Sequence, residues 1–106
     1  MDKRNKEWLV INVDGTITRH LGNRRPSYEQ IRKIVDMVER IPEFKRYEDR
    51  PCVAYCDENG KTKNLLLNEL ATTAWHEQLA KTGRPFDPVL LVGPVVIDFT
   101  RSSKRV

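Results

Sequence analysis

Cysteine is scarce in this sequence, with two residues, Cys52 and Cys56, among 106. They lie in the apolar run PCVAYC, which predicts a strand. Along a strand, Cα atoms four residues apart are separated by about 13 Å, which exceeds disulfide reach. His20 and His76 show no spacing typical of a zinc finger. We therefore expect two buried reduced thiols, no metal site, and a protein of the reducing cytoplasm.

Long hydrophobic runs are also absent. No apolar run approaches the ~20 residues that a membrane-spanning helix needs. The first residues, MDKRNKEW, place no apolar stretch after their basic residues, so we expect no cleavable secretion signal. A length of 106 residues is that of one compact domain with a modest core and little room for a deep cleft.

Catalytic motifs are missing as well. The chain has no glycine-rich phosphate loop and no His-Glu-x-x-His sequence. Residues 10–17, VINVDGTI, resemble the first signature of the haloacid-dehalogenase-like phosphatases, a strand followed by Asp-x-Asp-Gly-Thr. The resemblance places Asn12 at the nucleophile position, where an amide cannot form the aspartyl-phosphate intermediate. The sequence therefore predicts a protein that is not an enzyme and uses no cofactor.

A minimal hydrolase or nuclease is the alternative enzymatic hypothesis. His76 and Glu77, together with Asp36 and Glu39, can supply acid–base chemistry if the fold brings them together. Such catalysis needs a positioned partner, and no serine or cysteine nucleophile accompanies His76 in an evident pattern. We therefore interpret His76 as a residue at the flank of a packed helix.

Positive charge is concentrated at the two ends. The formal net charge is +4, of which residues 1–6 carry +2 and residues 101–106 carry +3, so residues 7–100 carry −1. This distribution predicts a basic N-terminal tail at 1–6, a single domain at 7–100 and a basic C-terminal tail at 101–106. A domain of charge −1 lacks the continuous basic footprint of a dedicated DNA-binding protein.

The N-terminal half predicts a hairpin followed by a helix. Residues 7–20 are rich in β-branched and aromatic residues, and Asp14-Gly15 is typical of a two-residue hairpin turn. Ser27 and Gln30 have the spacing of a capping box. Apolar residues then repeat at helical spacing, so we predict a helix over residues 28–40 that ends before Pro42.

The C-terminal half predicts two strands, a helix and a last strand. We expect strands over 52–56 and 61–67, joined by a polar turn. A helix should begin after Asn68 and end at Gly83. Residues 89–99 form the strongest strand pattern, which Gly93-Pro94 interrupts with a bulge, a bend or an edge.

The resulting order, ββ-α-ββ-α-β, predicts a single α+β domain. We expect one mixed or antiparallel sheet with two helices packed on one face. The helices should bury Ile34, Val38, Trp75 and Leu79 against this sheet, and Phe99 should lie in the core.

The candidate binding residues are basic and aromatic. Basic residues gather around the end of the hairpin and the start of the first helix, and two aromatic residues lie in the charged connection 43–51. The candidates are Arg19, His20, Arg24, Arg25, Arg32, Lys33, Phe44 and Tyr47. Arginine can pair with phosphates or with carboxylates of an acidic protein surface. The aromatic pair suits stacking on a nucleic-acid strand or anchoring a partner protein, and Phe44 can equally pin its loop to the core.

Residues 52–98 resemble a family of small proteins, a domain of unknown function found in bacteriophages, plasmids and bacterial genomes. The matching features are the turn Asp57-Glu58-Asn59-Gly60, the residues Asn68, Ala71 and Ala74, and the strand LVGPVVI over 91–97. The family has no accepted activity. The resemblance implies a small accessory protein of mobile elements, a kind of protein that commonly binds host proteins or nucleic acid.

Together these features predict a non-enzymatic accessory protein of phage or mobile-element type that binds a host protein and can thereby inhibit a host system. A nucleic-acid-binding accessory protein that uses residues 19–33 is the alternative. The charge of −1 over residues 7–100 favours the protein partner. We expect no membrane contact. The sequence leaves open the oligomeric state and whether the basic residues share one face.

Overall fold

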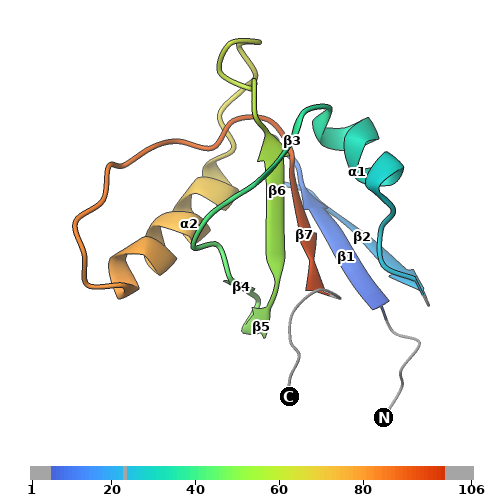
Figure 1. Cartoon of the computed structure of the whole chain (residues 1–106), viewed down its shortest axis with the longest axis horizontal. Helices are drawn as coiled ribbons and strands as arrows, with labels where there is room; N and C mark the ends of the chain where they lie inside the picture. The colour runs from blue at the N-terminus through green and yellow to red at the C-terminus, as the bar shows by residue number, and fades with distance from the viewer. Residues whose placement is uncertain (1–5, 23, 100–106) are drawn as a thin grey trace.

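The computed structural model describes residues 6–22 and 24–99. Five strands form one antiparallel sheet in the order β2-β1-β7-β6-β3, and β4 and β5 form a separate two-stranded ribbon (Figure 1). The strands are β1 (Lys6–Ile11), β2 (Ile17–Gly22), β3 (Val38–Arg40), β4 (Arg46–Tyr47), β5 (Arg50–Pro51), β6 (Val53–Asp57) and β7 (Val95–Asp98), and the helices are α1 (Tyr28–Val35) and α2 (Glu69–Lys81). The predicted α+β class is confirmed.

The two helices pack on opposite faces of the sheet, so the prediction of a single covered face is wrong. Neighbouring side chains of a strand point to opposite faces. Leu9 of β1 lies in the same buried cluster as Ala71 of α2, whereas Trp8 lies with Ile31 of α1. The run WLVI over 8–11 is buried throughout, as is typical of a strand that is covered on both sides.

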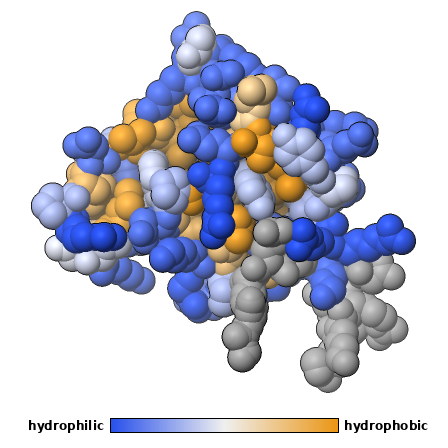
Figure 2. Space-filling model, viewed as in Figure 1, coloured by the Kyte–Doolittle hydropathy of each residue, from blue (hydrophilic) through white to orange (hydrophobic). Residues whose placement is uncertain are grey.

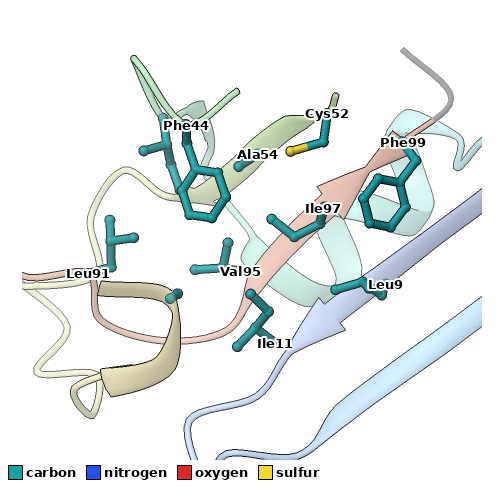
Figure 3. Packing of buried hydrophobic residues seen from close by; sticks show 11 residues of the cluster. Leu9, Ile11, Phe44, Cys52, Ala54, Leu91, Val95, Ile97 and Phe99 are labelled. Carbon is teal, nitrogen blue, oxygen red and sulfur yellow. The ribbon is translucent and has the colours of Figure 1, made fainter. Parts of the chain in front are cut away.

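The larger core lies between the sheet and α2. Its side chains converge from several elements and include Leu9, Ile11, Phe44, Cys52, Ala54, Leu91, Val95, Ile97 and Phe99 (Figure 3). The prediction that Phe99 is a core residue is confirmed. Trp75 and Leu79 are only half-buried. The Trp75 indole packs against this core, and its Nε1 donates to the carbonyl oxygen of Pro42 at 2.8 Å.

The first helix is shorter than predicted because the chain turns into a strand. α1 ends at Val35, Asp36 takes a φ of 39°, and β3 then pairs with β6. Val38 of β3 is half-buried against the α1 cluster, whereas Ile41 belongs to the opposite core. The apolar repeat over 28–41 therefore comes from two elements and from two faces, and the helix predicted to reach residue 40 is wrong beyond Val35.

Residues 58–64 form turns where a returning strand was predicted over 61–67. β6 lies between β7 and β3 and has no free edge for another strand. Lys63 links this turn region to the ends of α1 and β6, because its Nζ donates to Asp36 at 2.7 Å and to Asp57 at 2.9 Å. The hydrogen bond with Lys63 lowers the pKa of Asp36, and the hydrogen bonds to Asp36 and Asp57 raise the pKa of Lys63.

Asn68 joins α2 to the sheet. As predicted, it caps the helix, and its Oδ1 accepts from the Ala71 amide at 3.1 Å. Its Nδ2 donates to the carbonyl oxygens of Ile11 at 2.8 Å and of Gly93 at 2.9 Å. Gly93, with a φ of 77°, forms the predicted interruption before β7. β7 therefore begins at Val95, and the strand predicted from residue 89 is too long.

The ends of the predicted domain lie near the limits of the described residues. β1 begins at Lys6, which the sequence assigned to the N-terminal tail, and pairs there with Gly22 of β2. The remainder of the two predicted tails, 1–5 and 101–106, lies outside the described residues. Over 6–22 and 24–99, no helix combines the length and apolar character that crossing a bilayer requires.

Candidate functional site

The hairpin register places His20 on Trp8. The loop is longer than the predicted two-residue turn: Asn12 N donates to Thr16 O at 2.9 Å, Gly15 N donates to Asn12 O at 3.0 Å, and Gly15 has a φ of 89°. This is a three-residue loop with a glycine bulge. The change shifts the strand pairing by one residue, so Trp8 lies opposite His20, and their rings stack at 3.9 Å with 10° between their planes.

A capping box fixes the start of α1 beside this stack. Ser27 Oγ accepts from the Gln30 amide at 3.1 Å, and Gln30 Oε1 accepts from the Ser27 amide at 2.8 Å. Buried Pro26 precedes the cap. Arg24 and Arg25 therefore directly precede a proline and a helix cap that are fixed by packing and by hydrogen bonds.

Four of the predicted basic residues lie on the α1 side of the sheet, and we call them the cationic face: Arg24, Arg25, Arg32 and Lys33. All four are exposed. Within residues 6–22 and 24–99, no carboxylate forms an ion pair with any of them. The Arg32 guanidinium lies over the Tyr28 ring at 5.9 Å from its centre, and the Tyr28 side chain is 64% exposed. These groups are available to an anionic ligand.

Two shallow pockets flank the start of α1. One, of about 240 Å³, is lined by Trp8, His20, Leu21, Gly22, Arg24 and Gln30. The other, of about 220 Å³, is lined by Arg25, Pro26, Tyr28, Ile31, Val38, Tyr55 and Asp98, of which Asp98 is buried. Each pocket therefore combines one arginine of the cationic face with aromatic and apolar walls.

Arg19 lies on the other side of the sheet from the cationic face. It pairs across the strands with Leu9, whose side chain points to the α2 side. Its guanidinium donates to Glu48 and to Glu7, and Arg50 donates to the same Glu7. The hydrogen bond from Arg50 lowers the pKa of Glu7, and the hydrogen bonds to Glu48 and Glu7 raise the pKa of Arg19. Arg19 is therefore part of an ion-pair network within the protein.

Of the two aromatic candidates, Phe44 belongs to the core and Tyr47 packs against it. Phe44 is 2% exposed and lies among the side chains beneath α2 (Figure 3). Tyr47 is half-buried against the same core, with its ring centre 6.4 Å from that of Phe44. Arg50 contacts the same core, and its guanidinium carbon lies 3.9 Å from the centre of the Phe99 ring. Phe44 pins the loop to the core, as one of the sequence hypotheses held.

The residues of the enzymatic hypotheses have structural partners. Asn12 Nδ2 donates to Thr16 Oγ1 and to Thr18 Oγ1, each at 3.1 Å, inside the hairpin loop. Hydrogen bonds from Thr16 lower the pKa of Asp14. His76 Nε2 donates to the carbonyl oxygen of Val89 at 2.7 Å and so holds the segment after α2. In the described part of the chain, no group of three or more His, Cys, Asp or Glu side chains could hold a metal ion.

Neither thiol is activated. Cys52 is buried and Cys56 is half-buried, and both are free. Burial raises the pKa of Cys52 to about 12 and that of Cys56 to about 11. Both thiols are therefore protonated at neutral pH and are poor nucleophiles.

A second exposed feature is apolar. In Figure 2, hydrophobic groups gather on the left of this face, over α2 and the segment that follows it, and again near its centre. Phe86, Val89 and Leu90 of that segment are 38–47% exposed. The segment lies against His76, whose ring centre is 5.7 Å from that of Phe86. This strip carries no charged cluster comparable with the cationic face.

Sequence reasoning missed Trp8 and Tyr28, which supply the aromatic part of the site. Tyr28 directly follows the cap residue, and its spacing of four from Arg32 was a usable signal for a helical side-chain pair. The pairing of Trp8 with His20 depends on the hairpin register, which the two-residue turn hypothesis would set one residue away.

The comparisons with known proteins give no match: no family model, no curated protein and no solved structure is similar enough to place this chain in a family. The resemblance of residues 52–98 to a mobile-element family therefore stays a prediction.

Proposed function

We propose that this protein is a non-enzymatic binding module that recognises an acidic surface of another protein through the cationic face. The carrying observation is that Arg24, Arg25, Arg32 and Lys33 are exposed and form no ion pair with a carboxylate of the described residues, and that Arg24 and Arg25 each line a pocket with aromatic walls. Exposed arginine supplies bidentate hydrogen bonds to carboxylates.

The apolar neighbours of the cationic face favour a protein partner. Tyr28 is 64% exposed, lines a pocket with Arg25 and lies beneath the Arg32 guanidinium. Tyrosine, tryptophan and arginine are the residue types that dominate protein–protein hot spots. An acidic surface with a few apolar side chains would match this combination of charge and exposed apolar area.

Nucleic acid is the second candidate, because Tyr28 beneath Arg32 offers a ring on which a base could stack. A grip on phosphates by all four cations would give a log–log salt slope of about 3 to 4. We expect only weak association of the full chain with labelled single-stranded or duplex DNA. It should disappear when residues 1–6 and 101–106 are removed, because these tails carry charges of +2 and +3, whereas residues 7–100 carry −1.

The proposed setting follows from the same features. The resemblance of residues 52–98 supports a small accessory protein of phages or mobile elements that acts on a host protein. Two free thiols with raised pKa values suit the reducing cytoplasm.

Affinity capture from a nuclease-treated bacterial lysate tests the proposal. The unmodified chain should retain a partner protein that an Arg24→Glu/Arg25→Glu variant does not retain. Lys61→Glu/Lys81→Glu is the matched control, because it changes the net charge equally with exposed lysines away from α1. Equal retention by both variants, or tail-independent nanomolar binding to DNA, would overturn the proposal.

A further inference from the structure

β2 is an edge strand whose outward backbone groups can be assigned residue by residue. Paired residues in an antiparallel ladder alternate between hydrogen-bonded and non-hydrogen-bonded pairs. Because Asn12 N donates to Thr16 O, the bonded pairs that follow place Thr18 and His20 toward β1. The N–H and C=O groups of Ile17, Arg19 and Leu21 therefore point to the free edge, where the described residues form no further strand.

This edge lacks the usual protection against strand addition. Free edges are normally blunted by proline, by a bulge or by free charges. β2 contains no proline, and its register with β1 runs unbroken over residues 17–22. Its one charged residue, Arg19, is already neutralised by Glu7 and Glu48.

The surroundings of the edge differ between the two faces. On the α1 side, His20 and Arg24 line the pocket of about 240 Å³ at the end of β2, whereas Arg25 lines the other pocket, with Val38 of β3 and Tyr55 of β6. On the α2 side, Ile17 and the 69% exposed Leu21 offer apolar surface. A strand added here would place alternate side chains on these two faces. Carboxylates would suit the first face and β-branched apolar side chains the second.

We infer that the partner presents an extended acidic segment that pairs with β2 as a sixth strand of the sheet. Its backbone bonds to the outward groups of Ile17, Arg19 and Leu21, its carboxylates meet Arg24, and its apolar residues cover Leu21. Backbone pairing supplies affinity in this mode, and side-chain pockets supply specificity. This inference rests on the proposed function and names the form of the partner.

The test uses peptides of about 12 residues selected from a random library on the full chain, a length that covers a strand and its flanks. The enriched peptides should be acidic and should alternate carboxylates with Val, Ile or Thr. The best peptide, labelled with fluorescein, is then titrated with each variant and followed by fluorescence anisotropy. Leu21→Pro removes one outward N–H at an edge position that tolerates proline. It should weaken binding by at least about tenfold, whereas Leu21→Val, which keeps the N–H, should change it less than about threefold.

Amide hydrogen exchange of the unmodified chain gives the second readout and does not depend on the folding of the proline variant. Bound peptide should protect the amides of Ile17, Arg19 and Leu21, whereas those of Thr18 and His20 should already be protected in the free chain. No enrichment of acidic alternating peptides, or no new protection along β2, would overturn the inference. Loss of the captured partner with Arg24→Glu/Arg25→Glu but not with Leu21→Pro would overturn it and leave the proposed function standing.

Discussion

Asn68 shows how one side chain can determine where a helix meets a sheet. It is fully buried, and its amide makes three hydrogen bonds, to the end of β1, to the bend at Gly93 and to the first turn of α2. A buried polar group is stabilising only when its hydrogen bonds are complete. The sequence predicted the cap from residue type, but the bonds to Ile11 and Gly93 depend on long-range topology that no local pattern contains.

Asn68→Ala should lower the free energy of unfolding by about 2–4 kcal/mol, because it removes a helix cap and the side-chain donor to two carbonyl oxygens in the buried interior. Asn68→Asp should be worse, since it brings a carboxylate against the same two carbonyl oxygens. Urea denaturation measures both variants. The exposed Thr73→Ala in the same helix is the control and should stay close to the parent. A stability of Asn68→Ala equal to that control would contradict the role.

Glu7 links stability to pH. Its pKa is lowered from an ordinary 4.5, first by the hydrogen bond from Arg50 and then by that from Arg19. A lowered folded-state pKa stabilises the fold above the unfolded pKa, and this contribution is lost as pH falls through the folded pKa. The Tm of the parent should therefore drop between neutral pH and about pH 3 more steeply than the Tm of Glu7→Gln. Glu29→Gln, at an exposed position of α1, should keep the parental slope. Parallel curves for parent and Glu7→Gln would refute the assignment.

At the scale of elements, local sequence signals predicted the structure correctly where one residue type controls the backbone geometry. The capping box of α1, the Asn68 cap of α2 and the bend at Gly93 are where the sequence placed them. Periodicity failed over 28–41, because apolar residues of a helix and of the strand after it fell into one helical spacing. Strand pairing of β3 with β6 is a tertiary interaction, and it ended the helix early.

The candidate site was partly predictable for the same reason. The four residues of the cationic face were identified from composition, and they lie on the α1 side of the sheet because they precede or belong to the capped helix. Arg19 was grouped with them by sequence distance alone, and strand alternation moved it to the opposite face. Phe44 was a candidate anchor for a partner protein because its sequence neighbours are charged. In the structure it is buried in the core beneath α2.

Gly15→Ala tests the hairpin loop that sets the register of Trp8 and His20. Gly15 and Gly22 both have open space where the Cβ of an alanine would lie, but only Gly15 has a left-handed φ, of 89°. Gly15→Ala should therefore cost about 1–2 kcal/mol, whereas Gly22→Ala should be close to neutral. Thermal unfolding of the two variants provides the comparison. Equal effects would mean that the left-handed conformation does not define the loop.

At the scale of the whole molecule, the sheet separates two sets of charges. On the α2 side, Glu7, Glu48, Arg19 and Arg50 neutralise one another and tie the β4–β5 ribbon to β1 and β2. On the α1 side, the cationic face is free of such pairs within the described residues. The net charge of the chain does not reveal this division of charges between the two faces. The division is the reason for assigning binding to the α1 side.

A charge-swap titration of the purified partner protein measures the central claim most directly. Arg24→Glu/Arg25→Glu should weaken the Kd by about 100-fold, whereas Lys61→Glu/Lys81→Glu should change it less than about threefold. Replacing the facing carboxylates of the partner by lysine should restore much of the lost affinity to the first variant and none to the second, because only the first pair of sites is in contact. A Kd that both variants weaken equally, or that the swapped partner fails to restore, would contradict the account.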